Sequence, residues 1–141
     1  MPEHRIRLRG GWFLVDPSNP DAPPRRLTLP LASHPDPGRP VVLLRPFQRP
    51  PTDPARETLG LRLVSVPGLV EARLNDLPLT LVPMGTDGFR SVLGGDLPAR
   101  NRLVLRVGPD APTDGPGWGD VALVIRGRDM PPGGTGGRGL Q

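Results

Sequence analysis

The stretch Arg100-Asn101-Arg102-Leu103-Val104-Leu105-Arg106-Val107 decides the fold that we expect of this 141-residue chain. Leucine or valine stands at 103, 105 and 107, and arginine or valine stands at the positions between them. Successive side chains of a β-strand point to opposite faces of a sheet, so this order gives one apolar face and one mostly polar face. The stretch is therefore predicted to be a strand that covers a core with one of its faces.

The same period of two recurs along the chain, and no segment keeps the period of a helix. Alternating segments are Arg5–Arg9, Leu59–Val64, Val70–Leu74 and Val121–Arg126. Short apolar runs predict further strands at Trp12–Val15, Leu27–Leu29, Val41–Phe47, Leu77–Leu81 and Phe89–Leu93. Turn signals such as Pro67-Gly68 and Asn75-Asp76 separate them. About nine or ten short strands with turns between them are typical of an all-β sandwich or barrel.

Composition excludes several kinds of site. The chain has no cysteine, which rules out a disulfide framework, a thiolate zinc site and a cysteine nucleophile. All eighteen basic residues are arginine, and the net charge is +4. A genome rich in G and C explains this bias together with the many prolines and glycines. The alternative is selection for anion binding, for which arginine is well suited.

We expect one domain at 1–126, followed by a flexible tail rich in glycine and proline at 127–141, which has almost no apolar side chains to bury. The amino-terminal residues carry charges where a signal peptide needs an apolar run, and no stretch is long enough to cross a bilayer. The expected location is the cytoplasm, with no membrane partner.

The order of these features resembles the amino-terminal sugar-binding domain of glycoside hydrolase family 2 enzymes. The resemblance covers roughly Arg5–Arg126, and its order and spacing are more specific than any one motif. The segments that carry it are Gly11-Trp12-Phe13, Leu27-Thr28-Leu29-Pro30, Val41–Phe47, Leu59–Val66, Val70–Asn75, Phe89 and Arg100–Val107. It implies a two-sheet antiparallel β-sandwich, the jelly roll of galactose-binding-like domains.

The chain also departs from that family. Asp76 stands where the family hairpin has glycine, and Val41–Phe47 lacks the expected tryptophan or tyrosine. The catalytic barrel with its two carboxylates has no counterpart here. The resemblance therefore implies the accessory domain and not the hydrolase, and we expect no enzymatic activity.

Sugar recognition requires an aromatic surface and polar groups on neighbouring loops. The predicted ligand-binding residues are Trp118, Trp12, Asn75, Arg39, Arg100 and Asn101. Four of them have a structural alternative: both tryptophans fit a core position, Asn75 fits a turn, and Asn101 can satisfy backbone groups at a strand start. Trp118 lies between two glycines, and its exposure would best distinguish a sugar-stacking surface from a core position.

Other chemistry finds little support. Most aspartates stand beside proline, glycine or threonine in turns, where they serve backbone geometry, so no catalytic residue is predicted. Neither histidine has neighbours at zinc-ligand spacing, and no metal or cofactor is expected, although calcium near Asp110, Asp114 and Asp120 is conceivable. Arginines at 5, 7, 9, 62, 73, 102 and 106 could form a basic stripe. Single-strand binders interleave aromatic residues with such a stripe, and this chain has few, so we expect no nucleic-acid partner.

Two functions remain open. The first is a non-catalytic carbohydrate-binding-like module. The alternative is a structural or protein–protein interaction sandwich that has lost sugar binding.

Overall fold

The computed structural model describes residues 3–19, 21–31, 35–36, 38–53, 55–86, 88–93, 97–109 and 118–127. These residues form β-strands and no helix. The first strands are β1 (Glu3–Arg7), β2 (Trp12–Val15), β3 (Arg25–Leu27), β4 (Val41–Gln48), β5 (Glu57–Val64) and β6 (Leu69–Leu74). The remaining strands are β7 (Leu77–Pro78), β8 (Val82–Met84), β9 (Gly88–Val92), β10 (Arg100–Val107) and β11 (Asp120–Gly127).

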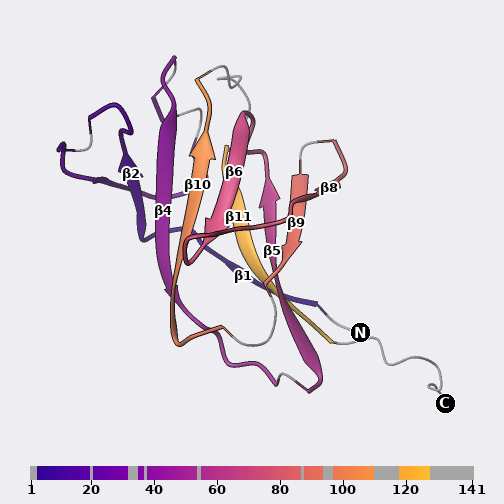
Figure 1. The fold of residues 1–141 in the computed structure, drawn as a ribbon. Coiled ribbons are helices and arrows are strands. Elements are labelled where there is room, and N and C mark those ends of the chain that lie inside the picture. Colours follow the sequence, from indigo (N-terminus) through magenta and orange to yellow (C-terminus); the bar gives the residue numbers. More distant parts are fainter. Residues whose placement is uncertain are drawn as a thin grey trace.

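The strands form two antiparallel sheets that face each other (Figure 1). The five-stranded sheet has the order β1-β11-β5-β9-β8, and the six-stranded sheet has the order β3-β2-β4-β10-β6-β7. From β4 onward the chain passes repeatedly between the sheets, so that several neighbours in a sheet, such as β5 and β11 or β4 and β10, are distant in sequence. This is the strand order of a jelly roll. The predicted all-β, two-sheet sandwich is confirmed.

The core lies between the two sheets, and burial follows the alternation of the sequence. In β10, Leu103, Leu105 and Val107 are buried, while Arg102 and Arg106 are exposed and Val104 is half-buried. In β5, the leucines at 59, 61 and 63 are buried in the same way. Strand β11 pairs with β1 and β5, and β10 pairs with β4 and β6, so the longest strands lie inside their sheets.

The β6–β7 hairpin turns at Asn75 and Asp76, which both have positive φ, 51° and 69°. Asparagine and aspartate tolerate this left-handed conformation better than other side chains, and paired positive values are typical of the tightest hairpin turns. The turn predicted from this dipeptide is therefore confirmed, even though Asp76 replaces a glycine of the resembling family.

Two predicted strands differ from the structure. Instead of Leu27–Leu29, β3 ends at Leu27, because the backbone N–H of Leu29 donates to the carbonyl of Arg9 and its side chain turns into the core. Of the predicted strand Leu77–Leu81, only Leu77–Pro78 forms a strand, β7, and the chain then crosses to the other sheet, where β8 begins at Val82. The chain crosses between the sheets at this point, and the sequence pattern contained no signal for the crossing.

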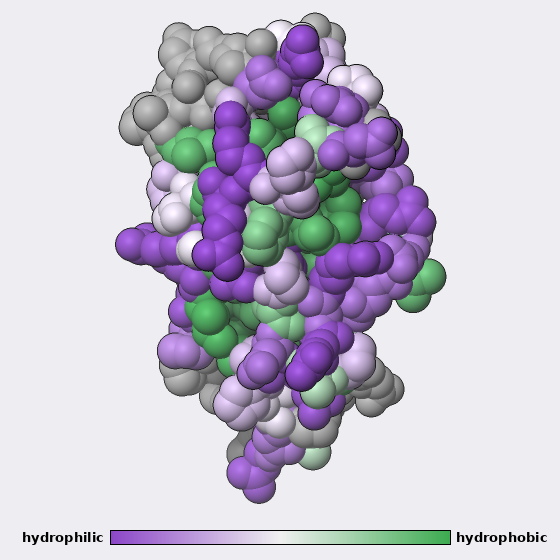
Figure 2. Space-filling model, turned by 90° about the vertical axis from the view of Figure 1, so that its left-hand side faces the viewer, coloured by the Kyte–Doolittle hydropathy of each residue, from purple (hydrophilic) through white to green (hydrophobic). Residues whose placement is uncertain are grey.

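The sandwich has two ends, which we name by residues. The Trp118 end holds the start of β4 and the end of β10, while the Asn101 end holds the end of β4 and the start of β10. At the Trp118 end, Trp118 and Leu31 exchange both backbone hydrogen bonds at 2.8 Å, and Gly119 donates to the carbonyl of Ser65. Figure 2 shows the side of the molecule nearest β2, where hydrophilic residues surround smaller hydrophobic areas. Of the predicted tail, residues 128–141 lie outside the described residues.

Candidate functional site

Both tryptophans lie in the core. Trp12 is 0% exposed, and its indole N–H donates to the carbonyl of Leu8 at 2.7 Å. Trp118 is 3% exposed and packs in the same apolar cluster. A sugar stacks on a ring face that is open to solvent, and neither ring offers one in this structure. Both tryptophans therefore occupy core positions, as the structural alternative predicts. A ligand-binding role for either ring stays an untested prediction.

Asn75 and Asn101 meet at the Asn101 end, and their amides are used within the protein. The side-chain oxygen of Asn75 accepts from the N–H of Arg102 at 2.8 Å, while its amide donates to the side-chain oxygen of Asn101 at 2.9 Å. Asn101 in turn donates to the carbonyl of Pro98 at 2.9 Å. This chain of bonds joins the β6–β7 hairpin to the start of β10. Arg100 is exposed beside it, and these residues line one shallow depression.

Arg39 stands apart from the other predicted polar residues. It precedes β4 at the Trp118 end, where its guanidinium lies 3.6 Å from the carboxylate of Asp16. The six predicted residues therefore do not form one site. Asn75, Arg100 and Asn101 are brought together, the two tryptophans are inside, and Arg39 is at the opposite end.

No group of three or more metal-ligating side chains comes together among the residues that the structure describes. Of the conceivable calcium ligands, Asp110 and Asp114 lie outside these residues, and Asp120 begins β11.

The predicted basic stripe is divided between opposite faces of the molecule. Arg5, Arg7 and Arg62 lie on the outer face of the five-stranded sheet, because their strand neighbours Ile6 and Leu61 face the core. By the same alternation, Arg102 and Arg106 lie on the outer face of the six-stranded sheet. No continuous stripe joins the two sets.

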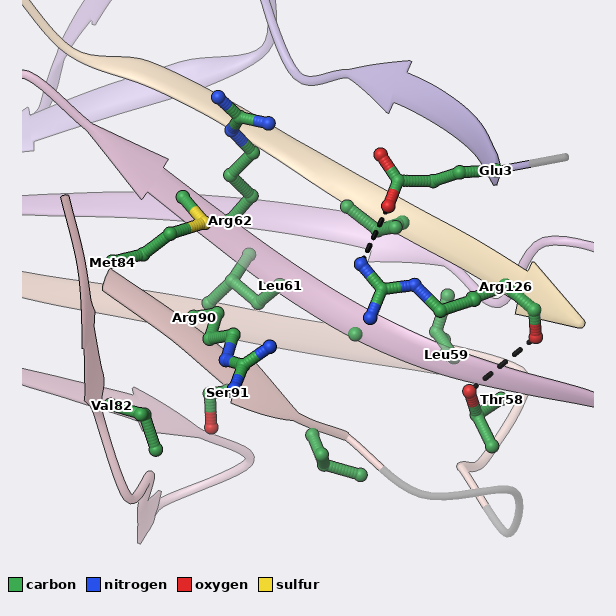
Figure 3. Close-up of a pocket in the computed structure, with 13 residues that line it drawn as sticks. Glu3, Thr58, Leu59, Leu61, Arg62, Val82, Met84, Arg90, Ser91 and Arg126 are labelled. Carbon is green, nitrogen blue, oxygen red and sulfur yellow. Dashed lines mark hydrogen bonds and ion pairs between the residues drawn. The ribbon is translucent and has the colours of Figure 1, made fainter. Parts of the chain in front are cut away.

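A hollow of about 340 Å³ opens on the outer face of the five-stranded sheet (Figure 3). Gly60 lies at its floor and has no side chain to fill the space between its cross-strand neighbours Val92 and Val124. We call it the Gly60 hollow. Its lining residues are Glu3, Thr58, Leu59, Gly60, Leu61, Arg62, Val82, Met84, Arg90, Ser91, Val92, Val124 and Arg126.

Apolar and basic side chains frame this hollow. Val124 is only 8% exposed although it points outward, whereas Val92 is 78% exposed and Val82 is 42% exposed on β9 and β8. Arg62 and Arg90 are directly opposite each other on β5 and β9. Within the described part of the chain, no hydrogen bond or ion pair engages either guanidinium.

Glu3 is the acidic residue that lines the Gly60 hollow, and its carboxylate is already occupied. It accepts from Arg126 at 2.6 Å and from Arg5 at 2.8 Å. The hydrogen bond from Arg126, and then the one from Arg5, lowers the pKa of Glu3 below its usual value of 4.5. The carboxylate therefore ties β1 to β11 and leaves Arg62 and Arg90 without an acidic partner.

We expect the Glu3→Gln variant to be slightly less stable than the wild type at neutral pH, because an exposed ion pair contributes little. A folded-state pKa below the unfolded value gives stability that is present above pH 4.5 and is lost as the pH falls through the folded pKa. Urea unfolding of both proteins across this range measures the difference. A difference that stays constant down to strongly acid pH would contradict the role of the charge.

The Gly60 hollow was missed by sequence reasoning. A glycine in the alternating run Leu59-Gly60-Leu61-Arg62-Leu63 stands at an outward position, and this was the available signal. A glycine inside a strand often marks a close approach of another chain or a ligand. The sequence did not indicate which strand would lie beside it, so the pairing of Arg62 with Arg90 could not be inferred.

The described residues thus define a jelly-roll β-sandwich with a basic hollow on one outer face. No family model matches the sequence, and no curated protein matches it. Two solved glycosidase structures share the fold. One is an FMN-binding β-glucuronidase from Facaelibacterium prausnitzii L2-6, with a TM-score of 0.66 and 18% identity over 87% of this chain. The other, proposed as a β-galactosidase from Bacteroides fragilis, has a TM-score of 0.63 and 17% identity over 89% of this chain.

The chain spans only 22% and 23% of those two glycosidase chains. It therefore corresponds in fold to one domain of much longer proteins, and identities this low show the shared fold alone. In the described residues, no helix is long and apolar enough to cross a membrane.

Proposed function

We propose that this chain is a non-catalytic β-sandwich domain that binds another protein through the outer face of its five-stranded sheet. The observation that carries the proposal is the Gly60 hollow, where exposed valines and arginines without carboxylate partners share one face. A contiguous exposed apolar patch rimmed by polar residues is a common mark of an interaction surface, and arginine is enriched in such surfaces. The similarity to one domain of larger enzymes supports an accessory role rather than catalysis.

The positions of the aromatic side chains disfavour carbohydrate binding. Trp12, Trp118 and Phe47 are buried, and Phe89 packs partly buried against the core. Phe13 lies on the outer face of the six-stranded sheet, but the guanidinium of Arg26 lies over its ring at 5.6 Å. The five aromatic residues of the chain therefore supply no open platform for a sugar ring.

Carbohydrate binding is nevertheless the second candidate function, because the fold is that of a glycosidase domain and because Asn75, Arg100 and Asn101 line one depression. The amides of both asparagines are bonded within the protein, as described above. A sugar would have to compete with these bonds. We therefore place protein binding first.

The test compares three proteins by quantitative affinity capture, followed by binding measurements with the purified partner. The wild type is compared with a Val82→Asp/Val92→Asp variant of the five-stranded face. A matched control, Val70→Asp/Leu77→Asp, changes equally apolar residues that are 65% and 69% exposed on the other sheet. We expect the partner to bind the wild type and the control at least about tenfold more tightly than the first variant.

Equal binding of the partner to all three proteins would contradict the proposed face. Specific binding of a glycan by the folded wild type, with no protein partner, would favour the second candidate instead.

A further inference from the structure

We infer that the Gly60 hollow binds a carboxylate between Arg62 and Arg90, and that the partner supplies it from an acidic segment which also carries an apolar side chain. The inference deepens the proposed function and rests on it. Three observations support it. Arg62 and Arg90 are opposite each other, the floor of the hollow at Gly60 is partly shielded from water, and exposed valines stand at the rim.

The pairing of Arg62 with Arg90 is unfavourable in the isolated chain. Cross-strand neighbours on one face lie close together, and like charges directly opposite each other destabilise the pairing. Four other strand arginines, but not all of them, are ion-paired: Arg5 and Arg126 with Glu3, Arg73 with Glu71, and Arg102 with Asp76. A bound anion would remove the repulsion between Arg62 and Arg90 and would gain hydrogen bonds from both.

The floor of the hollow makes such bonds stronger. Arg62 is half-buried although it is charged, and Val124 beside Gly60 is nearly covered. A guanidinium presents a planar fork that matches a carboxylate, and its bonds strengthen where water is partly excluded. Figure 3 shows the side chains of Arg62 and Arg90 extending in different directions from neighbouring strands, with Arg126 turned toward Glu3. Arg126 therefore remains committed to the protein. Binding of one carboxylate by both Arg62 and Arg90 requires their side chains to turn toward each other.

The residues at the rim favour an acidic peptide segment over a saccharide. Val82 and Val92 are exposed next to Arg90 and can contact an apolar side chain of a partner. No aromatic residue lines the hollow for a sugar ring. Strand β8 forms the edge of this sheet and contains Pro83, which cannot donate a backbone hydrogen bond, so addition of a partner strand at this edge is disfavoured. The segment is expected to lie across the face.

The test titrates the isotope-labelled full chain with a short synthetic peptide that carries neighbouring glutamates and a leucine, followed by NMR. The Arg62→Gln/Arg90→Gln variant is expected to bind this peptide about ten- to hundredfold more weakly than the wild type. The matched control, Arg73→Gln/Arg106→Gln, removes the same charge from the outer face of the six-stranded sheet and should bind like the wild type. Added salt should weaken the wild-type complex.

Three results would overturn the inference. They are equal binding of a peptide with glutamine in place of glutamate, equal weakening by the control variant, and binding of a glucuronate oligosaccharide in preference to the acidic peptide. Its failure can be distinguished from failure of the proposed function. A captured partner could lose affinity when Val82 and Val92 are changed but bind the Arg62→Gln/Arg90→Gln variant like the wild type. That result would support the protein-binding face and contradict the carboxylate site.

Discussion

The Trp12→Ala variant is expected to lose about 3–5 kcal/mol of unfolding free energy, a large part of the total stability of an ordinary domain. The ring is 0% exposed, so its removal leaves a cavity between the sheets. It also leaves the carbonyl of Leu8 without the indole N–H that it accepts at 2.7 Å. Urea unfolding measures the loss. Trp118 remains as the fluorescent reporter, because the chain has two tryptophans and no tyrosine.

The Trp12→Phe variant is the control for this prediction. It keeps most of the apolar volume, loses the indole N–H, and is expected to be destabilised by clearly less than the alanine variant. A residue that served as an exposed sugar platform would behave differently. Its replacement by alanine would change stability by only about 0.5 kcal/mol. A loss that small for Trp12→Ala would show that the ring is not part of the core.

The Gly119→Ala variant is expected to lose about 1–3 kcal/mol. Gly119 has φ of +87°, where a side chain is strained. A methyl group there would also lie 3.1 Å from Cδ2 and 3.2 Å from Cδ1 of Leu29, a buried residue of the Trp118 end. The glycine therefore allows the chain after Trp118 to approach the core closely. Chemical denaturation measures the cost.

Two other glycines allow the effect of backbone strain to be separated from the effect of the close contact with Leu29. Gly85 has a positive φ of 68° but open space around the position of a Cβ, so Gly85→Ala tests conformational strain alone. Gly10 has neither a positive φ nor a neighbour within 4 Å, so Gly10→Ala should be neutral or slightly stabilising. The expected order of loss is Gly119, then Gly85, then Gly10. A loss at Gly119 no greater than at Gly85 would contradict the close approach to Leu29.

The fold could be predicted from the sequence because the sheets follow simple alternation. Leu103, Leu105 and Val107 in β10 are buried as their spacing predicts, and the turn at Asn75 and Asp76 has the expected conformation. Both features are set by residues that are adjacent in the sequence, so they can be predicted without knowing which strands pair.

Alternation was a poor guide at Arg45. This arginine stands at an inner-face position of β4, between buried Leu43 and Phe47, where the pattern calls for an apolar residue. It is accommodated because Gly11 leaves room: a Cβ there would lie 3.1 Å from the guanidinium carbon. Burial lowers the pKa of this guanidinium. The space comes from the residue just before β2, a strand that pairs with β4 but is distant from it in sequence.

The candidate site could be predicted only in part, for the same reason. Asn75, Arg100 and Asn101 are three of the six predicted ligand-binding residues and lie together, but the amides of the two asparagines join a hairpin to a strand. The Gly60 hollow depends on β5 lying between β11 and β9, which is a property of the sheet order. The burial of Trp118 likewise depends on its pairing with Leu31, far away in the sequence.

NMR titration of the labelled full chain with the acidic peptide and, separately, with saccharides distinguishes binding at the Gly60 hollow from binding at the aromatic residues. The backbone signals of Gly60, Arg62 and Arg90 report on the five-stranded face. The indole N–H signals of Trp12 and Trp118 report on the aromatic residues in the same spectrum. We predict that the acidic peptide shifts the first set and leaves the two indole signals in place, and that saccharides shift neither. Indole signals that move on addition of a saccharide, with no peptide-induced shift at Gly60, Arg62 and Arg90, would show that the Gly60 hollow is not the binding site.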